Sequence, residues 1–251
     1  MKMRDKSMSV QIVEVIRRSE QGMTRPFICR GDDGEIYFVK GRDAGRRSLI
    51  SEWVAGHLGL ALGLPLAPFD IVDVPAELVL SGGVPDLADL GKGPAFGSMN
   101  REAMELNAAT VERVPAQLQR DVLAFDWWIR NPDRCLTDQG GNPNLFWDPA
   151  SAELVVIDHN QAFASNFDRK VFLELHVFAD QACAVFRDIA ARCEYNQRFT
   201  AALEDWDRIR ASVPEAWHFT DPEQTVPADF DLDAVNRWLL EFQQPDFWEK
   251  S

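Results

Sequence analysis

The chain has 251 residues, a formal net charge of −14, 46% hydrophobic residues and 26% charged residues. This is the composition of an ordinary globular protein, and so acidic a chain is unsuited to binding the phosphates of nucleic acid. The charged first residues do not resemble a secretory signal, and no apolar run approaches the ~18 residues of a membrane-spanning helix. We therefore expect a cytoplasmic protein with no nucleic-acid and no membrane partner.

The charge is unevenly distributed along the chain. Residues 1–50 carry a net charge of +4, whereas residues 51–251 carry −18. A charge bias of this kind is commonly a solvated face. A basic segment in an acidic protein can equally be the place where an anionic ligand binds.

The first part of the chain is rich in predicted strands. Alternating apolar residues predict a strand over 9–18, and two β-rich runs joined by Asp33-Gly34 predict a hairpin over 26–40. A helix is expected over 48–63, because its apolar residues recur at helical spacing before a Gly and a Pro. Residues 69–74 predict a further strand.

From about residue 101 the pattern becomes helical. Residues 115–130 predict a helix, and short strands at 144–147 and 153–158 predict a small hairpin. Residues 167–243 are typical of three or four amphipathic helices. Residues 80–98, rich in Gly and Pro, are expected to form a long loop.

Strands followed by helices indicate an α+β fold. We expect a β-rich N-terminal lobe with one helix over residues 1–80 and a connecting loop over 81–98. The expected helical C-terminal lobe, over 99–251, contains a catalytic loop and a metal-binding hairpin.

Acidic and amide side chains follow several of these predicted elements. Asp133 comes just after the helix ends, where its carboxylate can accept a proton from a hydroxyl, and Arg134 beside it can bind a carboxylate or phosphate through two hydrogen bonds. Asn142, Asn144 and Asp158 offer oxygen atoms suited to Mg²⁺. Each of these residue types also favours ordinary turns, and for any one of them alone a turn is an adequate explanation.

The N-terminal part supplies candidates for binding phosphate. Lys40 ends the second strand of the hairpin, and Glu52 on the next helix can pair with it. Gly22 and Thr24, between the first two strands, can bring backbone and hydroxyl donors to an anion. An exposed Lys, a solvated Glu and a hairpin turn are the alternatives.

Five stretches of the chain, taken together, resemble the HipA-like kinases and, more distantly, the phosphatidylinositol kinases. They are "YFVKG" (37–41), "SEWVAGHLGLALGLPLAP" (51–68), "NPDR" (131–134), "NPNLFW" (142–147) and "VIDHNQAF" (156–163). The resemblance implies a two-lobed protein-kinase-like fold that binds ATP and Mg²⁺ between its lobes.

The resemblance also implies a role for each matching residue. Lys40 matches the lysine that binds phosphate, with Glu52 as its partner on the helix. Asp133 matches the catalytic aspartate, and Asn142 and Asp158 match the metal ligands. The nine positions from Asp133 to Asn142 exceed the usual spacing of the family, so Asn144 is an alternative ligand.

These observations predict an ATP- and Mg²⁺-dependent kinase. By resemblance to HipA, the acceptor hydroxyl is expected on a protein Ser or Thr, with a small molecule as the alternative. A pseudokinase that binds nucleotide or a partner without catalysis is a second hypothesis, because the 133–142 loop is long and no multi-glycine phosphate loop is present. A Mg²⁺-dependent phosphohydrolase that uses Asp133 and Asp158, and in which Lys40 is dispensable, is a third.

Overall fold

The computed structural model describes residues 9–20, 24–101, 103–137, 140–149, 151–221 and 223–249. The chain divides into two compact units, each built from several stretches of sequence. Unit 1 comprises Met1–Ile50, Ala67–Arg101 and Pro214–Asp229, and unit 2 comprises Ser51–Leu66, Glu102–Val213 and Phe230–Ser251.

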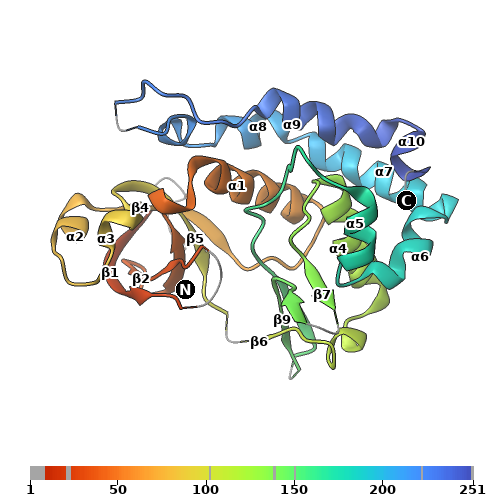
Figure 1. Ribbon diagram of the computed structural model, residues 1–251, viewed down its shortest axis with the longest axis horizontal. Helices are drawn as coiled ribbons and strands as arrows, with labels where there is room; N and C mark the ends of the chain where they lie inside the picture. The colour runs from red at the N-terminus through yellow and green to blue at the C-terminus, as the bar shows by residue number, and fades with distance from the viewer. Residues whose placement is uncertain are drawn as a thin grey trace. The chain divides into compact units, whose positions relative to one another are not determined.

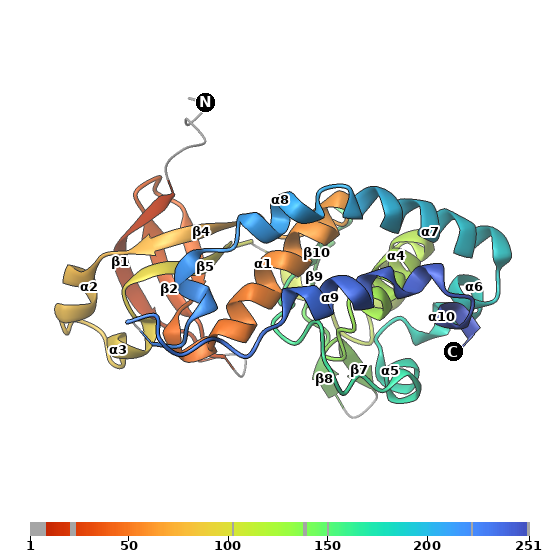
Figure 2. The same cartoon turned by 90° about the horizontal axis from the view of Figure 1, so that it is seen from above.

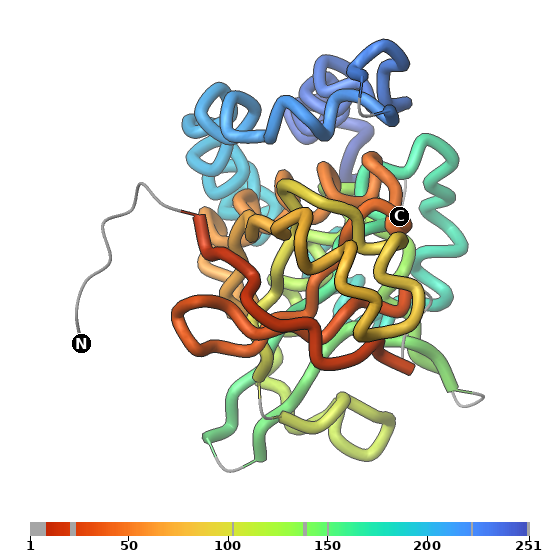
Figure 3. Tube along the Cα trace, turned by 90° about the vertical axis from the view of Figure 1, so that its left-hand side faces the viewer, coloured from red at the N-terminus to blue at the C-terminus, as the bar shows by residue number. Residues whose placement is uncertain are grey.

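Unit 1 contains a closed five-stranded barrel (Figures 1 and 3). Its strand order is β1-β2-β3-β5-β4; β1 and β4 are parallel, and the other neighbours are antiparallel. The predicted strands at 9–18 and 69–74 and the predicted hairpin are confirmed. The strands are β1 (Val10–Arg18), β2 (Phe27–Gly31), β3 (Ile36–Lys40), β4 (Phe69–Val74) and β5 (Gly93–Met99).

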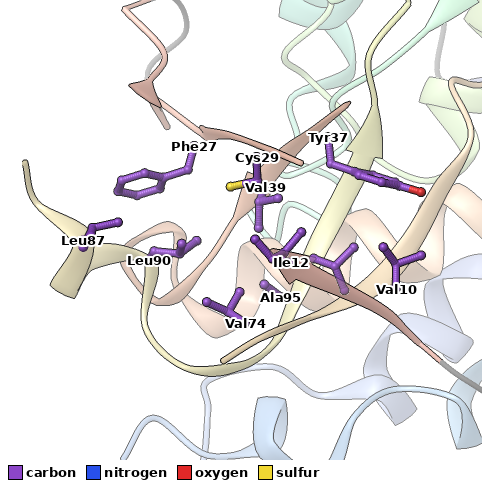
Figure 4. Close-up of a cluster of buried hydrophobic side chains, with 11 residues drawn as sticks. Val10, Ile12, Phe27, Cys29, Tyr37, Val39, Val74, Leu87, Leu90 and Ala95 are labelled. Atoms are coloured by element: carbon purple, nitrogen blue, oxygen red, sulfur yellow. The ribbon is translucent and has the colours of Figure 1, made fainter. Parts of the chain in front are cut away.

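Alternating side chains of the strands fill the barrel, as the two-residue period of a strand requires. Phe27 and Cys29 of β2 point inward with Tyr37 and Val39 of β3, and all four are buried (Figure 4). Burial raises the pKa of the Cys29 thiol to about 12, so this cysteine behaves as a small apolar core residue. The barrel core continues into Leu87 and Leu90 of a short helix.

The prediction of a long loop over residues 80–98 is wrong. The chain forms helices α2 (Ala76–Leu80) and α3 (Leu87–Leu90), and then β5, which pairs with both β3 and β4. Glycine concealed this strand because it lowers β propensity. At Gly97 it is required for packing, since a Cβ there would lie 2.6 Å from Cγ1 of Val72.

The limits of the two compact units differ from the expected domain limits. The second stretch of unit 1, Ala67–Arg101, continues through β5 instead of ending at residue 80. Residues 51–66 belong to unit 2, and residues 214–229 belong to unit 1. Tertiary packing places these segments, which composition along the chain does not reveal.

Unit 2 is mostly helical (Figure 2). Helix α1 begins in unit 1 and continues into unit 2, and further short helices accompany those predicted. The helices are α1 (Arg46–Ala61), α4 (Ala116–Trp128), α5 (Arg169–Leu175), α6 (Ala182–Phe186), α7 (Ile189–Leu203), α8 (Trp206–Ala211), α9 (Leu232–Leu239) and α10 (Asp246–Glu249). The 3₁₀ segments of the chain are η1 (Arg42–Ala44), η2 (Val111–Arg113), η3 (Ala179–Gln181), η4 (Glu215–His218) and η5 (Leu240–Gln243).

Two small sheets complete unit 2. The predicted hairpin near 144–158 is confirmed as β9 and β10, and β6 joins its edge. A second, two-stranded ribbon precedes it. The strands are β6 (Met104–Glu105), β7 (Cys135–Thr137), β8 (Gly140–Asn142), β9 (Leu145–Asp148) and β10 (Glu153–Val156).

An aromatic core joins α4, α7 and the C-terminal segment. Trp128 of α4 stacks on Phe199 of α7 at 4.2 Å between ring centroids, and its Nε1 donates to the Leu239 carbonyl at 2.8 Å. Trp248 Nε1 donates to Asn196 Oδ1 at 3.0 Å. The aromatic end of the chain therefore packs on its own unit. Among the helices of the described residues, none has the length and apolar character to cross a bilayer.

We expect Gly41→Ala to destabilise unit 1. Gly41 directly follows β3 and is buried, and a Cβ there would overlap the backbone carbonyl oxygen of Leu90. The end of α3 must then shift, at a cost of about 1–3 kcal/mol in unfolding free energy. Gly83→Ala is the control, because among the described residues only Ser81 Oγ, at 3.9 Å, lies within 4 Å of its Cβ. Thermal unfolding followed by circular dichroism compares the two, and equal melting temperatures would contradict the packing of Gly41.

Candidate active site

Between residues 130 and 163, five described non-glycine residues have left-handed backbone. One of them, Ala152, lies between β9 and β10, and the other four lie in the segments that carry the predicted catalytic and metal-binding residues. Their φ angles are 51° at Arg130, 51° at Asn144, 55° at Asp158 and 60° at Phe163. Such angles are uncommon outside glycine and persist only where the surrounding structure holds them. Their concentration in residues 130–163 indicates a functional site.

Asp133 and Asn144 are in direct contact. The Nδ2 of Asn144 donates to Oδ2 of Asp133 at 3.1 Å. Asn144 is 6% exposed and Asp133 is half-buried. The amide oxygen of Asn144 accepts no hydrogen bond from any residue the structure describes, and an oxygen in that state suits a metal ion.

Asp158 is joined to the same cluster through the backbone. The Ile157 N–H donates to the Asn144 carbonyl at 3.1 Å, so the residue before Asp158 is fixed beside Asn144. Asp158 comes directly after Ile157, two positions after the end of β10. Its Oδ1 accepts the backbone N–H of Asn160 at 3.4 Å, which closes a tight turn.

Arg134 joins the separate segments of the site. Its guanidinium is fully buried, and Nη1 donates to the carbonyl oxygens of Pro143 at 3.2 Å, Asn144 at 2.8 Å and Ile157 at 3.2 Å. Its Nε donates to Asp126 Oδ2 at 2.6 Å. The guanidinium of Arg134 therefore pairs with a carboxylate of the protein itself and holds the ends of the loops. The predicted role of Arg134 in catalysis stays a prediction.

Asp126, on α4, is the centre of this buried network. It is 0% exposed and accepts hydrogen bonds from Arg134 and from Asn131 Nδ2 at 2.8 Å. Burial by itself raises the pKa of Asp126, but the Arg134 guanidinium and the hydrogen bond from His176 outweigh it and hold that pKa well below its usual range. The carboxylate is therefore ionised opposite Arg134.

His176 completes the network as a neutral ring. Its Nδ1 accepts the Phe178 N–H at 3.1 Å, so the ring proton lies on Nε2, which is 3.0 Å from Asp126 Oδ2. Burial lowers the pKa of His176, in agreement with a neutral donor. The single negative charge of Asp126 therefore balances the single positive charge of Arg134.

Glu52 connects α1 to the turn at Asp158. Its Oε2 accepts the backbone N–H of His159 at 2.8 Å, and both residues are 2% exposed. The predicted partner of Glu52 was Lys40, which belongs to unit 1. That pairing stays a prediction, whereas the bond to His159 places Glu52 in the same cluster as Asp158.

Of the two candidate asparagines, Asn144 contacts Asp133. Asn142 is exposed at the end of β8, in register with Cys135 of β7. The long spacing after Asp133 is therefore a β-ribbon formed by β7 and β8. The resemblance matched Asn142 to the metal ligand and left Asn144 as the alternative, since both flank Pro143.

The predicted phosphate-binding residues lie in unit 1. Lys40 is at the end of β3, 8% exposed and in register with Phe96 of β5. Thr24 is half-buried in the turn between β1 and β2. Gly22 lies outside the described residues. How these residues approach the cluster in unit 2 stays a prediction.

Sequence reasoning missed Asp126 and His176. Asp126 stands between Phe125 and Trp127 in a helix that is buried from Val122 to Trp128, and a charged residue at such a position is a signal for a buried pair. His176 has no comparable signal, because its partner lies fifty positions earlier in the chain.

The donor set fits a magnesium ion. Asp158 and Asn144 offer carboxylate and amide oxygens, which hard cations prefer. Within the part of the chain that the structure describes, no group of three or more His, Cys, Asp or Glu residues is gathered for a metal. A magnesium ion at this cluster would therefore depend on the carboxylate of Asp158 together with the amide oxygen of Asn144.

One comparison with known proteins gives a match. A family model described as HipA-like kinase matches residues 12–251, which is nearly the whole chain. The search of curated proteins gave no match to this chain.

We expect Asp126→Asn to lower the unfolding free energy by about 3–5 kcal/mol, because it leaves the Arg134 charge buried without a counter-ion. Asp121→Asn is the matched control on the same helix. Asp121 pairs with the partly exposed Arg198 and accepts hydrogen bonds from Gln117 and Tyr195. The amide oxygen of an asparagine can still accept these bonds and no fully buried charge is left alone, so the loss should be smaller than at Asp126. Urea unfolding of both variants measures the difference, and equal losses would contradict a desolvated ion pair at Asp126.

Proposed function

The chain belongs to the HipA-like kinase family, and we propose that it transfers the γ-phosphate of ATP to a hydroxyl acceptor in a Mg²⁺-dependent reaction. The observation that carries this proposal is the contact between Asp133 and Asn144, with Asp158 fixed beside Asn144 through Ile157. A carboxylate, an amide and a second carboxylate in one cluster are the parts that phosphoryl transfer needs.

Asp133 is the proposed catalytic residue. Its carboxylate accepts the proton of the acceptor hydroxyl as the hydroxyl oxygen forms a bond to the γ-phosphorus. The bond between that phosphorus and the oxygen bridging to the β-phosphate breaks, and ADP leaves with the electron pair. The hydrogen bond from Asn144 fixes the orientation of the Asp133 carboxylate toward the proposed acceptor.

Asn144 and Asp158 are the proposed metal ligands, and Asn142 is not one of them. Bound there, Mg²⁺ would neutralise charge on the phosphate oxygens during transfer. Asn144 has two roles in this proposal, since its nitrogen holds Asp133 and its oxygen remains for the ion. This arrangement couples the position of the base to the position of the metal.

Lys40 is proposed to bind the nucleotide phosphates, with Glu52 as its partner and Thr24 and Gly22 as further phosphate contacts. In the same proposal, unit 1 corresponds to the small lobe of a protein-kinase-like fold and unit 2 to the helical lobe. The barrel supports a phosphate-binding role, because it holds Lys40 at the end of a strand with a buried stem. A protein Ser or Thr is the proposed acceptor, by resemblance to HipA.

Arg134 is proposed as a positioning residue. Three backbone carbonyls and one carboxylate already occupy its guanidinium, so it acts on the reaction through the loops that carry Asn144 and Asp158. The fixed fork of an arginine suits this role and a lysine would not reproduce it.

We expect Asp133→Asn to reduce ATP turnover by about 10²–10⁴-fold, because the amide cannot accept the proton. Turnover of ATP with Mg²⁺ measures this, and equilibrium binding of labelled ATP to the same variant is the control for folding. Wild-type protein that binds ATP but transfers no phosphate to any acceptor would support a pseudokinase. Phosphate release that persists in Lys40→Ala would favour a phosphohydrolase.

We expect Asn144→Ala and Asn142→Ala to differ although the residues are two positions apart. Loss of Asn144 removes a metal ligand and the hydrogen bond to Asp133, so half-maximal turnover should need roughly 10-fold more Mg²⁺ or more. Asn142 is exposed on the ribbon, and its loss should leave the magnesium titration unchanged. The opposite result would assign the metal to Asn142.

A further inference from the structure

The turn that follows β10 contains a buried polar atom that its surroundings do not satisfy. Asn160 is 8% exposed, and its Oδ1 is enclosed without a hydrogen-bond partner among the described residues. It lies two positions after Asp158, whose side chain accepts the Asn160 backbone N–H. A buried carbonyl oxygen without a donor is costly, so its retention calls for an explanation.

The backbone of this turn is hydrogen-bonded at several points. The His159 N–H donates to Glu52, and the Ala162 N–H donates to the His159 carbonyl at 3.0 Å. The Ser51 hydroxyl donates to the Ala162 carbonyl at 3.3 Å. These contacts fix the turn from both ends, and they leave the Asn160 amide oxygen as an acceptor inside a rigid frame.

Its position indicates what would satisfy the oxygen. The left-handed Asp158 and the hydrogen bond to its Oδ1 keep Asn160 within the turn that presents the carboxylate. A divalent cation at Asp158 is a group of the proposed site that takes amide oxygens as ligands. Rotation about χ2 of the asparagine exchanges its oxygen and nitrogen, so the oxygen has two positions in which to meet the ion.

We propose that Asn160 supplies a further oxygen ligand to the cation held by Asp158. This inference rests on the proposed function, because it assigns a ligand to the metal site of that function. The site would then take two amide oxygens, from Asn144 and Asn160, and one carboxylate, from Asp158. Each added oxygen from the protein replaces a water in the coordination of Mg²⁺.

Thermal unfolding in a MgCl₂ titration tests the proposal, at a fixed concentration of a non-hydrolysable ATP analogue. Asn160→Leu keeps the shape of the side chain and removes the oxygen, whereas Asn160→Asp keeps an oxygen ligand. We expect Asn160→Leu to need roughly 10-fold more Mg²⁺ for the half-maximal rise in Tm, and Asn160→Asp to need no more than wild type. Without Mg²⁺ and nucleotide, Asn160→Leu should melt at or above the wild-type temperature, because an unsatisfied buried acceptor is gone.

Asp158→Asn and Asn142→Leu are measured beside them as the ligand control and the exposed control. If Asp158→Asn changes the titration and Asn160→Leu does not, the Asn160 proposal is overturned while the proposed metal site stands. If the wild type shows no Mg²⁺-dependent rise in Tm, both are overturned. The proposal that Asn160 is a ligand is supported if Asn160→Leu needs more Mg²⁺ for the half-maximal rise in Tm while Asn160→Asp and Asn142→Leu need no more than wild type.

Discussion

The buried ion pair between Arg134 and Asp126 is the interaction on which the candidate site depends. Both side chains are 0% exposed, and removing two charges from water costs several kcal/mol per ion unless other hydrogen bonds compensate. Here Asn131 and His176 satisfy the carboxylate, while three backbone carbonyls satisfy the guanidinium. Such a pair contributes little to stability. It does fix the positions of the groups around it, because each of them is hydrogen-bonded to one of the two buried side chains.

This arrangement explains how the chain accommodates a ribbon between Asp133 and Asn144. Arg134 lies immediately before β7, and it binds the carbonyls of Pro143 and Asn144 immediately after β8. Both ends of the insertion are therefore fixed by one side chain. The β7–β8 ribbon can lengthen the sequence between Asp133 and Asn144 without separating the two, which the 3.1 Å contact between them shows.

Sequence patterns predicted those parts of the fold that local chemistry decides. Alternation in β1 and the Asp-Gly turn before β3 are local signals, and both elements were predicted. Strand β5 was not, because the packing of Gly97 against Val72 is visible only when β4 lies beside it. In the candidate site, Asp133 and Asp158 were predicted from their positions after apolar elements. We propose Asn144 instead of Asn142 because of the left-handed backbone of Asn144 and its contact with Asp133. Neither feature can be predicted from the sequence.

The strained residues of the site need a rigid support, and the aromatic core of unit 2 provides it. Arg130 has φ of 51°, and its guanidinium is held by Glu241 at 2.6 Å and stacks over Trp238 at 4.7 Å. The Ile129 carbonyl accepts the Phe163 N–H at 2.7 Å, which links α4 to the segment after Asp158. The C-terminal helices thus restrain the same backbone that carries Asp133. Because left-handed residues and a buried unsatisfied oxygen each cost stability, they persist only where such packing offsets them, and this places the docked C-terminal segment among the requirements of the site.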